Sequence, residues 1–234
     1  MAPGGVLRAG VNLGNPTVVQ KPEGGGELRG VGPALARELA RRLGARVEFV
    51  TYDSAAKMAE FAKQGAWDVA FLAVDPQRAN EIAFSAPYMQ IEATYMVRAD
   101  SRLRKPEDVD RKGVRIATNN NAAFDMWLQR NLKNAERVLA YTSGAAVELF
   151  MAQQDIDAAA GVRNTLAGYA AKNPGYRVMD VNFSTVGQAA GVPRSRPASA
   201  KYLHAFIEEM KASGFVARAL KESGVTDASV APAG

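Results

Sequence analysis

The sequence predicts an α/β fold made of two units, each a parallel or mixed sheet flanked by helices. Two observations support this prediction. Short apolar runs alternate with longer segments of helical periodicity over about residues 7–72, and the same alternation returns over about residues 114–180. A helix between two strands favours parallel pairing, because it carries the chain back across the sheet.

The first unit opens with an expected strand at residues 7–11 and a loop rich in Gly, Asn and Pro. A helix is expected at 31–43, where Leu35 and Leu39 share one apolar face and Gly44 ends the helix. There follow a strand at 47–52, a helix from Ser54 to Gly65, and a buried strand at 67–72.

The next segment carries an arginine at an expected helix start. Asp75 and Pro76 are typical of an N-cap and a first turn, which places Arg78 inside that turn. Backbone N–H groups at a helix start favour an anion, and a guanidinium binds a carboxylate through two parallel hydrogen bonds. The alternative is a surface arginine paired with Glu81 or Asp75.

A long strand at 89–98 is expected to lead into the second unit. That unit comprises expected strands at 114–118, 136–140, 156–160 and 176–180, with helices at about 122–133, 144–153 and 163–172. The chain then returns through 187–192 and ends in amphipathic helices at 198–212 and 215–223, with a loosely ordered tail from 225 to 234.

Composition excludes several classes of function. The 234 residues contain no cysteine, so disulfides, thiolate catalysis and zinc–sulfur sites are excluded. The net charge of +5 comes from basic and acidic residues that are interleaved, which suits a small anionic ligand and not nucleic acid. No apolar run approaches the roughly 20 residues that span a bilayer, and no signal peptide is visible, so we interpret Met1 as the start of a mature chain; a cytoplasmic protein is the alternative.

The segments around Arg78 carry a resemblance to a known family. Residues 75–78 (DPQR) followed by 82–88 (IAFSAPY) resemble the T-x-x-R…(V/I)-x-F-S-x-P-Y signature of bacterial extracellular solute-binding proteins of the polar amino-acid family. Further similarities lie at 30–43, 65–69, 114–117 and 157–159, so that the resemblance covers roughly residues 6–224.

The resemblance implies a two-lobed "Venus flytrap" with crossover strands near 92–96 and 185–189. Lobe 1 would comprise residues 5–95 with 190–224, lobe 2 residues 96–189, and 225–234 a C-terminal tail. It also implies a monomeric, periplasmic component of an ABC importer that captures a small carboxylate-bearing solute by cleft closure. A membrane permease would be its partner, and neither a cofactor nor a metal is expected.

Ligands of such sheets bind beyond the carboxyl ends of the strands, which selects four loops. The first holds Asn12 and Asn15, where the family often has a polar residue and then an aromatic one; ordinary turn chemistry is the alternative. The second is Phe71, Leu72 and Ala73, whose backbone would support Arg78 in holding a carboxylate, with Phe71 as apolar wall or core residue.

The third loop holds Asn121 and Ala122, where related proteins usually show Gly-(Ser/Thr). Asparagine tolerates a left-handed backbone, so the N–H groups of residues 122–124 would approach an anion; an exposed polar loop is the alternative. The fourth loop has Val162 where many amino-acid binders carry an aspartate for the α-ammonium. Arg163 follows it as a second candidate for a carboxylate or as a solvated helix start, and Glu92 remains as a substitute ammonium receptor.

Three functions are compatible with these residues. The first is the transport-associated binding protein. The second is an enzyme of the cyclohexadienyl-dehydratase type on the same scaffold, which the sequence disfavours because its one histidine, His204, lies far from every selected loop. The third is a soluble ligand-sensing module. No catalytic residue is therefore assigned.

Overall fold

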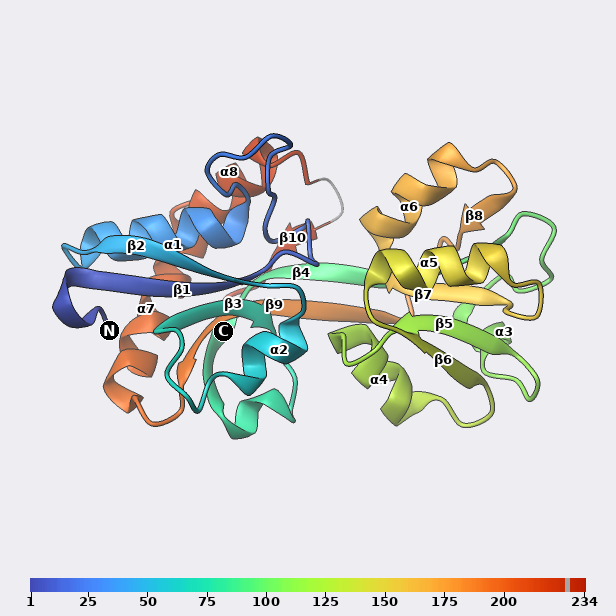
Figure 1. Cartoon of the computed structure of the whole chain (residues 1–234), viewed down its shortest axis with the longest axis horizontal. Helices are drawn as coiled ribbons and strands as arrows, with labels where there is room; N and C mark the ends of the chain where they lie inside the picture. Colours follow the sequence, from blue (N-terminus) through green and yellow to red (C-terminus); the bar gives the residue numbers. More distant parts are fainter. Residues whose placement is uncertain (226–227) are drawn as a thin grey trace. The chain divides into compact units, whose positions relative to one another are not determined.

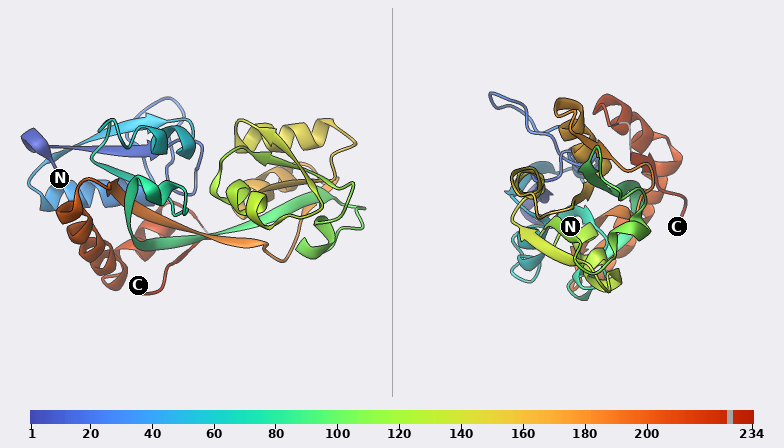
Figure 2. Two further views of the ribbon diagram at one scale, coloured as in Figure 1. Left: turned by 90° about the horizontal axis from the view of Figure 1, so that it is seen from below. Right: turned by 90° about the vertical axis from the view of Figure 1, so that its right-hand side faces the viewer.

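The computed structural model describes residues 1–225 and 228–234, which fall into two compact units. Unit 1 comprises Met1–Gln90 and Gly187–Gly234, and unit 2 comprises Ile91–Val186. The chain passes between them within two strands, β4 (Ile82–Arg98) and β9 (Ser184–Pro193). These are the long green and orange strands of Figures 1 and 2. The predicted α/β class, with a mixed sheet flanked by helices, is confirmed.

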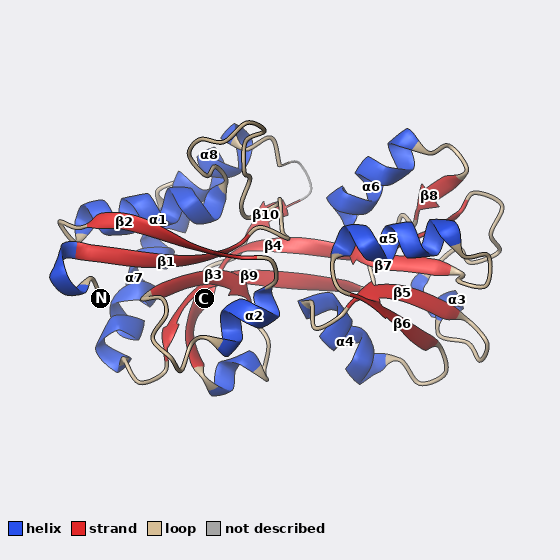
Figure 3. Ribbon diagram, viewed as in Figure 1, coloured by secondary structure: helices blue, strands red, loops and turns tan. Residues whose placement is uncertain are grey.

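Each unit contains its own set of strands and helices (Figure 3). Besides its parts of β4 and β9, unit 1 contains η1 (Pro3–Gly5), β1 (Val6–Asn12), α1 (Val31–Arg42), β2 (Arg46–Tyr52), α2 (Ala55–Glu60), β3 (Val69–Ala73), η2 (Arg78–Asn80), α7 (Pro197–Ala212), α8 (Phe215–Glu222) and β10 (Ala228–Val230). Unit 2 contains α3 (Pro106–Val109), β5 (Arg115–Asn119), α4 (Ala123–Asn131), β6 (Glu136–Ala140), α5 (Ser143–Ala152), β7 (Ala158–Val162), α6 (Arg163–Lys172) and β8 (Tyr176–Val178).

The two units repeat one strand pattern. In unit 1, β1 pairs in parallel with β2 and β3, and β3 pairs antiparallel with β9. In unit 2, β5 pairs in parallel with β6 and β7, and β7 pairs antiparallel with β4. Three parallel strands therefore end at one edge in each unit, which is where an open α/β sheet binds its ligands.

The two units also share a pair of hydrogen bonds just before their third parallel strand, which is β3 in unit 1 and β7 in unit 2. In unit 1 the Asp68 carboxylate accepts the N–H of Arg8, and the Asp68 N–H bonds to the Arg8 carbonyl. Asp157 and Arg115 make the same two bonds in unit 2. Of these two aspartates, Asp68 is the fully buried one. Its carboxylate also accepts hydrogen bonds from the guanidinium groups of Arg8 and Arg196. Burial by itself would raise the pKa of Asp68, but these hydrogen bonds outweigh it and hold the pKa below its ordinary value.

Side chains along β3 point alternately to the two faces of the sheet in unit 1. Ala70 and Leu72 belong to a cluster with Met58 and Trp67 on the side of α2. Phe71 points to the opposite face, where its Cβ approaches Gly32 of α1. In unit 2 the main cluster packs α5 and α6 on the strands and includes Met96, Ala117, Val147, Phe150 and Leu166.

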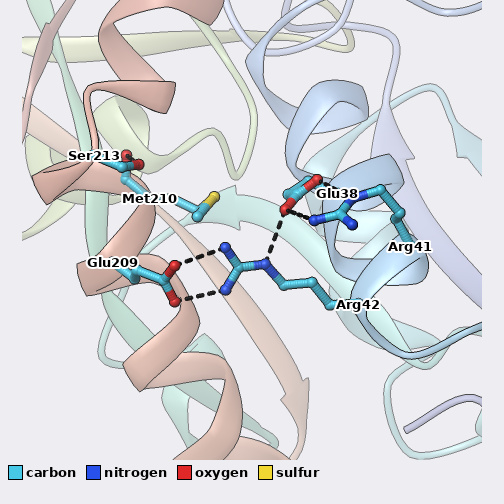
Figure 4. A network of polar contacts seen from close by, with 6 residues as sticks. All are labelled: Glu38, Arg41, Arg42, Glu209, Met210 and Ser213. Carbon is cyan, nitrogen blue, oxygen red and sulfur yellow. Dashed lines mark hydrogen bonds and ion pairs between the residues drawn. The ribbon is translucent and has the colours of Figure 1, made fainter.

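An ion-pair network links α1 to α7 within unit 1 (Figure 4). Arg42 donates to Glu38 on its own helix and to both carboxylate oxygens of Glu209 on α7, at 2.6 and 2.7 Å. Arg41 donates to the same Glu38, and these hydrogen bonds lower the pKa of Glu38 to about 2.

Several expected elements differ in the structure. The strand expected at 89–98 begins at Ile82, because Pro87 lies inside it and obscures the strand pattern. The helix start expected at Asp75 and Pro76 is a single 3-10 turn, η2, whose N-cap is Gln77; Asp75 precedes the turn and its side chain accepts the N–H of Gln77. The tail expected to be loosely ordered contains β10, which pairs with β4; residues 226–227 of that tail lie outside the described residues.

Candidate functional site

The carboxyl ends of β1, β2 and β3 bring three segments of unit 1 together. Asn12 at the end of β1 is in register with Tyr52 at the end of β2, and Val11 is in register with Phe71 on β3. The predicted residues Asn12, Asn15, Phe71, Leu72, Ala73 and Arg78 all lie at or next to this edge. We call them the unit 1 edge.

Arg78 is the buried cation of the unit 1 edge. Arg78 is only 6% exposed. Its Nη1 donates to the carbonyl oxygen of Ala73 at 3.1 Å. Burial lowers the pKa of Arg78 to about 10, while Asp75 acts in the opposite direction. The guanidinium is therefore charged at neutral pH, although burial disfavours its charged form.

The two asparagines form one loop and have different environments. The side chain of Asn12 accepts the N–H of Gly14, as in an Asx turn. The N–H of Asn15 donates to the carbonyl of Asn12, and the carbonyl of Asn15 accepts the N–H groups of Val18 and Val19. The side-chain oxygen of Asn15 is buried and accepts no hydrogen bond within the described part of the chain, so it is a candidate acceptor for a ligand.

Phe71 and Leu72 place little side-chain surface at the unit 1 edge. Phe71 is 1% exposed, and its ring packs edge-on against Tyr88 with centroids 6.2 Å apart. Leu72 is 2% exposed and belongs to the cluster on the side of α2. Both side chains are therefore core residues, and the contact of Arg78 in this segment is with the carbonyl oxygen of Ala73.

Tyr52 is a candidate that the sequence reasoning missed. It ends β2 beside Asn12, and its ring lies 5.9 Å from that of Phe61. Burial raises the pKa of its hydroxyl, which stays protonated and available as a donor at neutral pH. The carboxyl-end rule that selected the other loops applies equally to β2, and it points to this aromatic residue.

Asn121 and Ala122 follow β5 at the corresponding edge of unit 2. Asn121 has a φ of 57°, the one left-handed non-glycine backbone in residues 1–225 and 228–234, as its residue type indicated. Its N–H donates to the Asp125 carboxylate, and the N–H of Ala122 donates to the carbonyl of Asn119. Ala122, not the asparagine, is the N-cap of α4. Two of the three N–H groups expected to face an anion, those of Ala123 and Phe124, belong to the first turn.

Glu92 and Arg163 form an ion pair in unit 2. The Nε of Arg163 donates to Oε2 of Glu92 at 3.0 Å, across the pairing of β4 with β7. Asn182 and the carbonyl of Asp180 accept further hydrogen bonds from the same guanidinium. Arg163 is the first residue of α6, as predicted, but it is not a freely solvated helix start.

Three further observations concern metal ligands, the histidine and the helices of the described residues. Within them, no group of three His, Cys, Asp or Glu side chains is arranged to hold a metal ion. His204 is exposed on α7, where its Nδ1 accepts the N–H of Ala86 at 3.3 Å. Among the described helices none is long and apolar enough to cross a membrane.

Comparison with known proteins identifies relatives over most of the chain. The sequence model of the bacterial extracellular solute-binding proteins, family 3, matches residues 7–223. No match is found among curated protein sequences.

Solved structures share the fold over nearly the full length. A mutant of ArgBP from T. maritima is 22% identical with a TM-score of 0.79, over 95% of this chain and 96% of that one. The amino acid ABC transporter substrate-binding protein AbpA from Streptococcus pneumoniae, bound to L-arginine, is 18% identical with a TM-score of 0.78, over 94% of both chains. The ancestral amino acid-binding protein AncCDT-1, a precursor of cyclohexadienyl dehydratase, is 22% identical with a TM-score of 0.77, over 93% of this chain and 95% of that one.

Proposed function

The chain belongs to the bacterial extracellular solute-binding proteins of family 3, and from this membership we propose that it is the ligand-capturing component of an ABC importer. Its ligand is a small solute that carries a carboxylate, an amino acid or a related organic anion. A membrane permease is its partner, the periplasm is its location, and it acts as a monomer.

The buried guanidinium of Arg78 supports this proposal. A cation that is 6% exposed next to the carboxyl ends of parallel strands lies where an open α/β sheet binds its ligands, and its charge is complementary to an anionic ligand. The carboxylate would lie against Arg78, with Asn15 of the unit 1 edge and the neighbouring Tyr52 as further polar contacts. Amino acids in the names of the similar structures are consistent with a ligand of this class.

An enzyme of the dehydratase type is the weaker alternative. AncCDT-1 is named a precursor of such an enzyme, so the scaffold supports that chemistry elsewhere. Dehydration needs a general acid or base. In this chain the carboxylate of Glu92 is hydrogen-bonded to Arg163, and His204 is on an exposed helix face.

The test is ligand binding to the wild type and to Arg78→Met. A panel of L-amino acids, small organic acids and small solutes without a carboxylate is screened by thermal shift, and each hit is measured by calorimetry. Truncating one partner of a buried charge pair costs about 2–5 kcal/mol, so we expect Arg78→Met to weaken binding at least thirtyfold. Arg41→Met is the matched control, because its side chain is 70% exposed. Unchanged affinity in Arg78→Met, or hits confined to solutes without a carboxylate, contradicts the anchor; product formed from prephenate would favour the enzyme. Small-angle scattering with and without a hit tests the expected closure.

A further inference from the structure

We propose that Arg194 is a positioning residue for Arg78: by holding the short turn that carries Arg78, its side chain raises the affinity of the unit 1 edge for a carboxylate. Arg194 directly follows β9, and both arginines belong to unit 1. In this role Arg194 acts through Arg78 and not by contact with the ligand. The inference rests on the proposed function, since it concerns the affinity of the same anchor.

The turn that carries Arg78 is too short to be stable by itself. It is the 3-10 turn η2, which comprises three residues, and isolated helical turns of this length are unstable in water. The N–H of Ala79 donates to the carbonyl of Asp75 at 3.0 Å, and the N–H of Glu81 donates to the carbonyl of Arg78 at 3.1 Å. The last carbonyl groups of a helical turn have no donor within the turn. Those of Ala79 and Glu81 therefore need donors from another part of unit 1.

Arg194 supplies a donor to each of these two carbonyl groups. Its backbone N–H donates to the carbonyl of Glu81 at 2.8 Å, and its Nη1 donates to the carbonyl of Ala79 at 2.6 Å. An arginine that donates to the last carbonyl groups of a helix stabilises its end, and the charge of the donor strengthens the hydrogen bond. Ala79 is the immediate neighbour of Arg78 in the sequence, so the side chain of Arg194 fixes the backbone next to the anchor.

The guanidinium end of Arg78 is supported separately, by β3. Its Nη1 donates to the carbonyl of Ala73, the last residue of β3. Ala73 is in register with Gln188 of β9, so the strand that leads to Arg194 also pairs beside this acceptor. A side chain that binds a ligand must be held within about 0.5 Å of its productive position. Loss of the Arg194 side chain removes one of these two supports and leaves the other.

Two other cations of unit 1 provide matched controls. Arg196, two positions further along the chain, donates to the carboxylate of Asp68 just before β3 and not to η2. Lys63 pairs with the side chain of Glu81 at 2.8 Å, and the two side chains are 69% and 40% exposed. An ion pair this exposed contributes little, and it holds a side chain, whereas Arg194 holds the peptide groups of the turn.

The experiment compares Arg194→Met with Arg194→Lys and with the controls Arg196→Met and Lys63→Met. The twenty common L-amino acids, succinate and glutarate are the probes, and their binding is measured by calorimetry. Hydrogen exchange of residues 75–81 is followed by mass spectrometry without a probe.

We expect Arg194→Met to weaken the binding of each carboxylate probe, and to speed the exchange of residues 75–81, by at least about threefold. The change stays moderate because Arg194 is exposed, so that water screens its hydrogen bond. Arg194→Lys keeps a cationic donor and should restore most of both values. Both controls remove one positive charge and should stay within about twofold of the wild type in affinity and in exchange. Arg196→Met should nevertheless lower Tm more than Arg194→Met, because it removes a partner of the buried Asp68.

The outcomes separate the positioning role from the proposed function. If Arg78→Met loses binding while Arg194→Met binds as the wild type does, the positioning role is wrong and the anchor stands. If Arg194→Met loses affinity with unchanged exchange of residues 75–81, or if Arg196→Met loses as much affinity, Arg194 acts by its charge alone and the inference is overturned. If none of the probes binds the wild type, or if Arg78→Met binds them normally, the proposed function fails and the inference with it.

Discussion

Asp68 offers the sharpest test of how unit 1 is held together. Its fully buried carboxylate accepts four hydrogen bonds, from the N–H, Nε and Nη2 of Arg8 and from Nη1 of Arg196, at 2.8–3.0 Å. Removing one partner of a buried ion pair costs about 3–5 kcal/mol. Because the side chains of Arg8 and Arg196 are 35% and 32% exposed, they can recover water, so we expect Asp68→Ala to lower the free energy of unfolding by about 3 kcal/mol.

Thermal unfolding monitored by circular dichroism measures this loss. For a chain of this size about 1 kcal/mol corresponds to roughly 2–4 °C in Tm, so Asp68→Ala should lower Tm by about 6–12 °C. Asp157→Ala is the matched control in unit 2. The carboxylate of Asp157 accepts a hydrogen bond from the N–H of Arg115, but within the described residues it accepts none from an arginine guanidinium. We expect it to cost about 1 kcal/mol. Equal losses in the two variants would refute the reasoning.

The comparison of wild type with Asp68→Ala also leads to a prediction about pH. Hydrogen bonds from Arg8 and Arg196 overcome burial and depress the pKa of Asp68 below its ordinary 3.8 in the folded state. The unfolded chain therefore takes up the proton first as the pH falls. The stabilisation is present above about pH 4 and is lost below it. The Tm difference between wild type and Asp68→Ala should accordingly be constant from pH 8 to 5 and shrink towards pH 3.

Two further predictions concern single backbone features. Ala231 is 5% exposed and its N–H donates to the carbonyl of Tyr88, so truncation after Val225 should uncover part of the β4 edge. Because an uncovered edge pairs with other chains, we expect a larger apparent mass in light scattering. An unchanged monomeric profile would contradict this role of β10. Asn121 has a φ of 57°, so Asn121→Gly should keep Tm within a few degrees, whereas Asn121→Val should cost about 1–2 kcal/mol; equal Tm values for the two variants would show that the left-handed backbone is not the constraint.

Local chemistry was readable without the structure. The order of strands and helices followed from apolar periodicity, because each element must bury one face wherever its neighbours lie. The left-handed backbone at Asn121 is one that its residue type was expected to tolerate, because that tolerance is intrinsic to the side chain and its own peptide groups. The placement of Arg78 after a buried strand was equally local.

Partners distant in the sequence were decided by the tertiary structure alone. Glu92 and Arg163 were expected as separate receptors for opposite charges, yet the pairing of β4 with β7 joins them over 71 positions. Arg196 reaches Asp68 over 128 positions, and β10 reaches β4 from the far end of the chain. A residue's type sets what charge and hydrogen bonds it can offer, but only packing sets which other group receives them, and that choice determines whether a charged side chain is available to a ligand or already neutralised.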